Sequence, residues 1–217
     1  MIMEDRMKHL DTLIRRYPAL APVRADIEAG YRLLADAYRA GGKLLVAGNG
    51  GSCADADHIV GELMKGFVLP RPVPADLAER LRALDPERGD ALARRLQGGL
   101  PAIALTQHPA LTTAYMNDVD GGSALVFAQQ AYVLGRAGDV FLGISTSGNS
   151  ENVLEAALVA RARGMKVLAL VGQGGGRLAG VADVAIRVPA TETYQIQEYH
   201  LPVYHALCLM LEEEFFS

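Results

Sequence analysis

Two short stretches of the chain carry histidine together with carboxylate or amide side chains at helical spacing. His58 and Glu62 lie four residues apart, so a helix would project both from one face. Gln197 and His205 lie eight apart, about 80° around an ideal helix, and His200 is an alternative partner for Gln197. Either pair alone is typical of a solvated helix face. Two imidazoles, one carboxylate and one amide oxygen could together hold a divalent transition metal, and zinc suits such ligands.

Two loops between apolar runs and helix-like stretches could bind an anion. "GNGGS" at 48–52 lacks the third glycine of a dinucleotide fingerprint and the lysine of a phosphate loop, so alone it indicates only a strand-to-helix turn. The second loop, within 144–157, offers four hydroxyl side chains just before a helix: Ser145, Thr146, Ser147 and Ser150. Hydroxyls and free N–H groups at a helix N-terminus can bind phosphate without metal or lysine. Helix capping by Ser147 or Ser150 is the alternative, but one cap needs only one hydroxyl.

Five short apolar runs alternate with helix-like stretches along the chain. The runs are 43–47, 101–105, 140–145, 166–171 and 184–188. The helix-like stretches are 54–65, 109–116, 122–134, 150–163 and 193–215, the last with Pro202 inside it, where a kink is expected. This alternation predicts an α/β domain with parallel strands and helices on both faces. Ligands of such sheets bind beyond the carboxyl ends of the strands, so the loops after Ala47, Leu105, Ser145 and Val171 form the predicted site.

The chain divides into a helical extension over 1–40 and a domain over 41–217. The extension contains one amphipathic helix ending near Pro18 and a second from about Pro22 to Gly41. One small sheet does not need both of these apolar helices to cover it, so we expect their apolar stripes to pack between subunits of an oligomer. The segment 66–101 is a charged, proline-rich excursion with helical pieces near 75–84 and 87–96. We expect it to cover the site or to extend a subunit contact.

Composition excludes several classes of protein. The 217 residues carry a net charge of −4 without a long basic run, which argues against nucleic-acid binding. Cys53 and Cys208 cannot form a disulfide framework, and this fits a reducing cytoplasm. The N-terminus lacks the apolar core of a signal peptide, and no apolar run approaches the roughly 18 residues of a membrane span. We therefore expect a cytoplasmic protein that binds a small ligand or a protein partner.

Several motifs resemble the sugar isomerase (SIS) domain family and, within it, the phosphoheptose isomerases. They are "GKLLVAGNGGS", "DADHIVGEL", "LPAIALT", "ND" at 117–118, "GDVFLGISTSGNSENV", "GMKVLALVG" and "IQEYHLPVYH". The resemblance covers most of 41–206 and implies a three-layer, flavodoxin-like domain with a five-stranded parallel sheet. It also implies a homotetramer with active sites at subunit boundaries. The implied reaction converts sedoheptulose 7-phosphate to D-glycero-D-manno-heptose 7-phosphate.

The same resemblance assigns roles to individual residues. One Zn²⁺ per active site would be bound by His58, Glu62, Gln197 and His205. Glu62 and His205 would be the catalytic acid–base pair. Substrate would contact Asn49, Gly50, Gly51, Asn117, Asp118 and Gln197. Its phosphate would be held by Ser52, Ser145, Thr146, Ser147 and Ser150.

The chain departs from the family pattern in two places, and other functions compete with the isomerase. Tyr194-Gln195 stands where the family commonly has Asp-Arg, and 66–101 is longer than the usual connection. An isomerase of a different ketose phosphate is therefore one alternative. Another is a non-enzymatic SIS protein that binds a replication initiator protein; Glu62 and His205 favour the enzyme. A third is the sugar-phosphate-sensing domain of a regulator, against which the absence of a DNA-binding segment argues.

Overall fold

The computed structural model describes residues 2–217, with side chains from residue 7 onward, and contains one parallel sheet. Its strands are β1 (Leu44–Gly48), β2 (Ala102–Ala104), β3 (Val140–Ser145), β4 (Lys166–Val171) and β5 (Val184–Arg187). They are ordered β2-β1-β3-β4-β5, and every neighbouring pair is parallel. This is the flavodoxin-like strand order, so the predicted fold class is confirmed.

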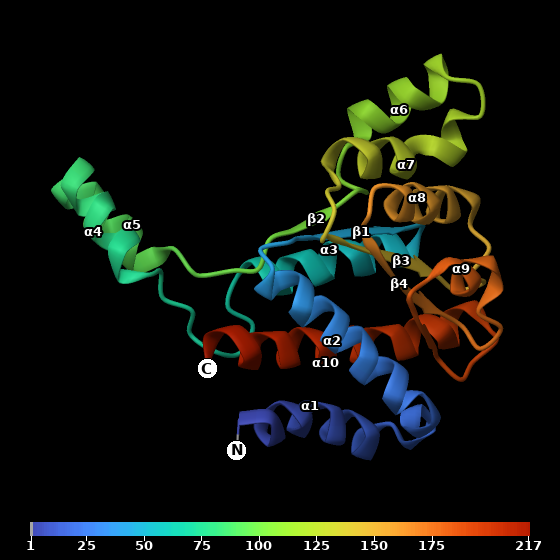
Figure 1. The fold of residues 1–217 in the computed structure, drawn as a ribbon, viewed down its shortest axis with the longest axis horizontal. Coiled ribbons are helices and arrows are strands. Elements are labelled where there is room, and N and C mark those ends of the chain that lie inside the picture. The colour runs from blue at the N-terminus through green and yellow to red at the C-terminus, as the bar shows by residue number, and fades with distance from the viewer. Residues whose placement is uncertain (1) are drawn as a thin grey trace.

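Helices cover both faces of the sheet in three layers (Figure 1). One face is covered by α2 (Arg24–Arg39), α3 (Gly51–Met64) and α10 (Thr193–Phe216), with α1 (Ile2–Arg16) packed outside α10 and the 3-10 helix η1 (Pro18–Val23) leading into α2. The other face is covered by α7 (Gly122–Leu134), α8 (Glu151–Ala162) and α9 (Gly176–Val181), and α6 (Pro109–Asp118) lies on α7. The strands are continuous apolar runs because helices bury them on both faces.

Alternate residues of each strand enter two separate cores. In β1, Leu44 and Val46 join the core beneath α2, α3 and α10, whereas Leu45 and Ala47 join the core beneath α7 and α8. All five residues of β1 are buried. This alternation follows from the two-residue period of a strand, and it fixes which helix faces which side of the sheet.

The N-terminal helices are part of the first core. The predicted apolar face of α2, including Ile27, Tyr31, Leu34 and Tyr38, is buried within the chain, and α1 buries Leu10 against the same cluster. These stripes are therefore already covered, and they no longer argue for an oligomer.

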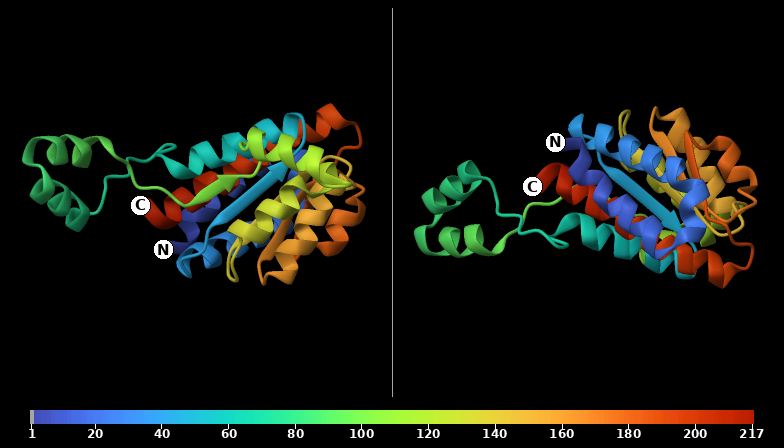
Figure 2. Two further views of the ribbon diagram at one scale, coloured as in Figure 1. Left: turned by 90° about the horizontal axis from the view of Figure 1, so that it is seen from above. Right: turned by 90° about the horizontal axis from the view of Figure 1, so that it is seen from below.

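The excursion forms a helical hairpin that projects from the body (Figures 1 and 2). Its helices are α4 (Ala75–Leu84) and α5 (Pro86–Arg95), within one or two residues of the prediction. The Asp85 carboxylate accepts hydrogen bonds from the backbone N–H groups of Glu87 and Arg88 and so caps α5. An antiparallel bridge between Pro72 and Gln97 closes the base of the hairpin.

Two elements were not predicted, and the interruption expected at Pro202 is not observed. Helix α9 lies in a glycine-rich stretch without an apolar helical repeat, and η1 replaces the predicted start of α2. Helix α10 runs without interruption past Pro202. No helix among residues 2–217 has both the length and the apolar character needed to cross a membrane.

His200 on α10 makes folding stability depend on pH. Its side chain is 0% exposed and neither ring nitrogen has a hydrogen-bond partner among the described residues. Burial lowers the pKa of His200 to about 4, although the backbone of Val171 partly opposes this. The folded state therefore keeps His200 neutral while the unfolded chain takes up a proton near its ordinary pKa of about 6.5. Stability is complete above about pH 6.5 and falls by up to about 3 kcal/mol as the pH approaches 4.

Urea unfolding from about pH 7 to about pH 4 measures this effect. His200→Leu should show a shallower loss of stability than the parent over that window, and His108→Leu, at an exposed histidine, should follow the parent. Parallel curves for the parent and His200→Leu would contradict the assignment.

Candidate functional site

The glycine loop and the hydroxyl loop lie side by side at the carboxyl end of the sheet. They follow β1 and β3, which are adjacent strands, at the point where the strand order reverses. The side-chain amides of Asn49 and Asn152 join the loops through two reciprocal hydrogen bonds of 2.8 and 2.9 Å. Asn152 was not predicted as a site residue, although its place in the first turn of α8 was a usable signal.

The glycine loop brings α10 against the start of α3. Gly50 has a φ of 57°, which favours glycine, and the buried Ser52 follows in the first turn of α3. A Cβ on Gly51 would lie 2.5 Å from the side-chain nitrogen of Gln197. Gly51 is therefore the contact point for Gln197.

The hydroxyl loop leaves the N-terminus of α8 without a side-chain cap. Ser150 occupies the N-cap position, but its Oγ lies 3.0 Å from Ser145 Oγ and accepts no capping hydrogen bond. Ser147 Oγ accepts a hydrogen bond of 3.1 Å from the backbone N–H of Asn149. The first-turn N–H groups thus remain open toward an anion, and the capping alternative does not account for the hydroxyls. Thr146 connects the loop to β4, because its carbonyl accepts from Gly172 N–H.

A pocket of about 370 Å³ opens beside the glycine loop. It is lined by Asn49, Gly50, Thr106 and Asn152, among others, and by residues of α6 and α7. Asn117 and Asp118 lie at the exposed end of α6, where Asn117 Nδ2 donates to Asp118 Oδ1 at 2.9 Å. These two predicted substrate contacts do not line this pocket within one chain.

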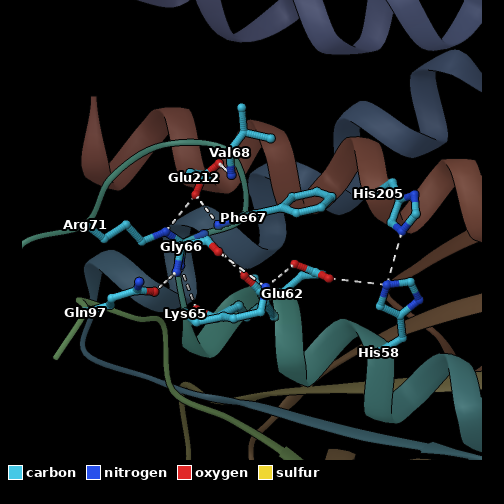
Figure 3. A network of polar contacts seen from close by, with 11 residues as sticks. His58, Glu62, Lys65, Gly66, Phe67, Val68, Arg71, Gln97, His205 and Glu212 are labelled. Carbon is cyan, nitrogen blue, oxygen red and sulfur yellow. Dashed lines mark hydrogen bonds and ion pairs between the residues drawn. The ribbon is translucent and has the colours of Figure 1, made fainter. Parts of the chain in front are cut away.

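A second cluster lies farther along α3, where α10 runs beside it (Figure 3). His58 Nε2 is 3.3 Å from Glu62 Oε1 and 3.5 Å from His205 Nε2. The structure thus brings together three of the four predicted metal ligands. Gln197 lies against Gly51 instead, and eight residues of helix separate it from His205, about 12 Å along an ideal axis.

The electrostatics of this cluster favour a neutral His205. Burial lowers the pKa of His205, the neighbouring His58 lowers it further, and Glu62 opposes both. Lys65 Nζ lies 2.9 Å from the other carboxylate oxygen of Glu62. His58 is 41% exposed, so the cluster is open to solvent. A pocket of about 220 Å³ between α1 and α10 also reaches His205.

A buried ion pair anchors the end of α3 just beyond Glu62. Arg71 Nε donates to Glu212 Oε1 at 2.8 Å, and Arg71 Nη1 donates to the carbonyl of Leu63 at 2.8 Å (Figure 3). The Glu212 carboxylate also accepts from the backbone N–H groups of Phe67 and Val68. Burial raises the pKa of Glu212, but these backbone donors and Arg71 outweigh it and lower the pKa overall.

This pair connects the site to the excursion. Arg71 binds carbonyls that the last turn of a helix leaves unpaired, and the same loop places the Phe67 ring 5.6 Å from the His205 ring. This pair could not be predicted from the sequence, because Glu212 stands in a run of three glutamates that is typical of an exposed helix end.

The fold and the two loops define the chain as a SIS domain protein, and residues 87–172 match the family model described as "SIS domain". The phosphoheptose isomerase of Geotalea daltonii is 42% identical over 191 residues, covering 88% of this chain and 85% of the relative. The phosphoheptose isomerase structures from Neisseria gonorrhoeae and Francisella tularensis superpose with TM-scores of 0.72 and 0.73, at 34% and 30% identity. Those alignments cover 98% and 97% of this chain, and 99% and 98% of the two solved chains.

The chain belongs to the phosphoheptose isomerase family. The family resemblance predicted from the motifs is therefore confirmed.

Proposed function

We propose that this protein interconverts sedoheptulose 7-phosphate and D-glycero-D-manno-heptose 7-phosphate as an aldose–ketose isomerase. One observation carries the proposal: helix α3 begins beside the open, uncapped hydroxyl loop and carries a carboxylate–imidazole cluster farther along. An elongated sugar phosphate can bind with its phosphate at the first site and its carbonyl carbons at the second. The names of the relatives support this substrate class.

Glu62 and His205 can carry out the proton transfers. The reaction removes a proton from one sugar carbon, passes through an enediol and returns a proton to the neighbouring carbon. We assign the carbon-bound proton to Glu62, because a carboxylate accepts it readily. His205, whose neutral form is favoured because burial and His58 lower its pKa, accepts and returns the hydroxyl proton. Glu62 and His205 both contact Nε2 of His58, and this shared neighbour supports the pairing.

A zinc ion fits the donor set of this cluster. Ligands at 2.0–2.2 Å from a tetrahedral Zn²⁺ lie ~3.3–3.5 Å from one another, and the two contacts of His58 Nε2 are 3.3 and 3.5 Å. Among residues 7–217, whose side chains the structure describes, no three His, Cys, Asp or Glu side chains are already arranged to hold a metal ion, so the ligands must move closer together on binding. His58, Glu62 and His205 would hold the ion, whereas Gln197, the fourth ligand predicted from the sequence, lies against Gly51 and outside this cluster. When bound, zinc would stabilise the negative charge that develops on the sugar oxygens.

The phosphate site comprises the open end of α8 and the start of α3. Its donors are the side chains of Ser52, Ser145, Thr146, Ser147 and Ser150 together with first-turn N–H groups. Asn49 and Gly50 line the pocket beside the glycine loop, whereas Gly51 lies against the side chain of Gln197.

Two further parts of the proposal concern assembly and location. We infer a homotetramer with active sites at subunit boundaries: α6 buries no residue within the chain, so its Asn117 and Asp118 are free to meet a neighbouring subunit's substrate. We infer a cytoplasmic location because both cysteines are free thiols, which is typical of a reducing compartment.

A substrate panel followed by NMR tests the function. The protein should convert sedoheptulose 7-phosphate to an aldoheptose phosphate and leave unphosphorylated sedoheptulose unchanged. Ser147→Ala should raise KM for the phosphorylated sugar about 10- to 100-fold, since one hydrogen bond to a charged group contributes ~1.5–3 kcal/mol.

Ser217→Ala, at an exposed serine, should match the parent. Conversion of a shorter ketose phosphate in preference to the heptulose would replace the substrate but keep the reaction. Equal binding of phosphorylated and unphosphorylated sugar would overturn the phosphate site. No conversion of any ketose phosphate would favour the alternative of a non-enzymatic SIS protein.

A further inference from the structure

Two polar residues, Tyr204 and Asp55, form a hydrogen-bonded chain behind His58, on the side away from Glu62. His58 Nδ1 is 3.0 Å from the Tyr204 hydroxyl, which lies 3.2 Å from Asp55 Oδ1. Tyr204 is 2% exposed and comes from α10, whereas Asp55 lies one helical turn before His58 on α3. The other carboxylate oxygen of Asp55 is buried and has no hydrogen-bond partner among the described residues. The proton transfers proposed above use neither Tyr204 nor Asp55.

Donor and acceptor counts favour one direction for these hydrogen bonds. The Tyr204 hydroxyl has one hydrogen, and a carboxylate can only accept. The hydroxyl therefore donates to Asp55 and its oxygen accepts from His58 Nδ1–H. A neutral imidazole has a single N–H, so Nε2 then carries a lone pair. Nε2 is the nitrogen that faces Glu62 and His205.

Glu62 opposes this arrangement. Its Oε1 atom, 3.3 Å from His58 Nε2, would favour a hydrogen on Nε2. Tyr204 thus favours a proton on Nδ1 of His58, and Glu62 favours a proton on Nε2. The hydrogen bonds through Tyr204 to Asp55 must be stronger than the contact with Glu62 if Nε2 is to remain unprotonated. An apolar residue at position 204 would leave Nδ1 without a hydrogen-bond partner, and the Nε2–H tautomer that Glu62 favours would then predominate.

We propose that Tyr204 and Asp55 are positioning residues that hold His58 as its Nδ1–H tautomer, with the Nε2 lone pair directed at the Glu62–His205 cluster. Partners of this kind orient metal-binding or catalytic histidines and raise the basicity of the free nitrogen. The role of the lone pair as a ligand rests on the proposed function, but the tautomer does not.

The tautomer can be read directly from the ¹⁵N shifts of the imidazole nitrogens in the metal-free protein, at a pH where histidines are neutral. His58→Ala identifies the His58 signals by their loss. In the unmutated protein Nδ1 should be the protonated nitrogen. A predominantly Nε2–H imidazole in that protein would overturn the proposal without any variant at position 204.

Tyr204→Phe removes the hydroxyl but keeps the ring, which lies edge-on to both histidine rings at centroid distances of 5.5 and 5.0 Å. This variant should switch His58 to the Nε2–H tautomer and weaken Zn²⁺ binding, measured by calorimetry, ~10- to 100-fold. Tyr38→Phe is the matched control, because Tyr38 is also buried but its hydroxyl has no partner among the described residues. It should change neither the tautomer nor the affinity.

An unchanged tautomer in folded Tyr204→Phe would contradict the proposal. Absence of Zn²⁺ binding by the unmutated protein, with the Nδ1–H tautomer present, would instead remove the proposed metal site and leave the positioning role intact.

Discussion

Glu62→Gln is expected to abolish turnover and to stop deuterium from D₂O entering recovered substrate. Glutamine keeps an oxygen at the same place but cannot accept a proton from carbon, and a positioned base contributes ~10²–10⁴-fold. Deuterium exchange reports the first proton transfer alone, so it separates loss of the base from loss of a later step. The measurement is NMR of substrate and product after incubation in D₂O.

Metal content must be measured in the same samples, since loss of zinc would imitate loss of the base. Glu79→Gln, at an exposed glutamate of α4, is the matched control and should behave as the parent. His205→Asn should lose turnover but keep some exchange, because Glu62 still takes the first proton. If metal-replete Glu62→Gln exchanges deuterium at the parent rate, another group is the base, and Asp118 is the next candidate.

Breaking the pair of Arg71 and Glu212 is expected to cause the largest loss of folding stability. The two side chains are 0% and 1% exposed, so removing one leaves a buried charge without its partner. Such a change costs about 3–5 kcal/mol. Arg71→Met should therefore lower the free energy of unfolding in urea by about this amount. It should also reduce turnover, because Arg71 binds the carbonyls of Glu62 and Leu63 at the end of α3.

The exposed pair of Arg82 and Asp90 provides the control. Arg82→Met should cost less than about 1 kcal/mol, as is usual for a surface ion pair. The double variant Arg71→Met with Glu212→Leu should be more stable than the sum of the two single losses predicts, because neither charge is then left alone. If Arg71→Met lowers the free energy of unfolding no more than Arg82→Met does, the buried pair is no more important for stability than the exposed one.

The sheet and most helices could be predicted because each depends on local sequence. The strands are continuous apolar runs, α4 carries an apolar stripe of Leu77, Leu81 and Leu84, and Asp85-Pro86 marks the start of α5. Helix α9 could not be predicted, since its glycines carry no apolar period and its position depends on contacts such as that between Gly176 and Gly148. Packing across the sheet, rather than helix propensity, decides that segment.

The site divides in the same way. The pairing of His58 with Glu62 could be predicted from their spacing on one helix, and the hydroxyl loop could be predicted as a turn before α8. The approach of His205 depends on α3 and α10 lying side by side, which spacing within either helix does not encode. The pairs formed by Tyr204 with Asp55 and by Arg71 with Glu212 join residues more than 140 positions apart. From the sequence, Tyr204 would be interpreted as an ordinary core residue, because it lies in an apolar helix.

The hairpin of α4 and α5 is attached to the domain at a single closed point. The segments that lead into and out of the hairpin meet at the bridge between Pro72 and Gln97, and the two helices beyond that bridge pack on each other. Because the chain enters and leaves the hairpin at the same place, we expect that the segment between these two residues can change in length without moving the sheet. The hairpin can therefore be regarded as a modular insertion beside α3, and replacing it by a short turn between residues 72 and 97 is expected to leave α3 and the sheet in place.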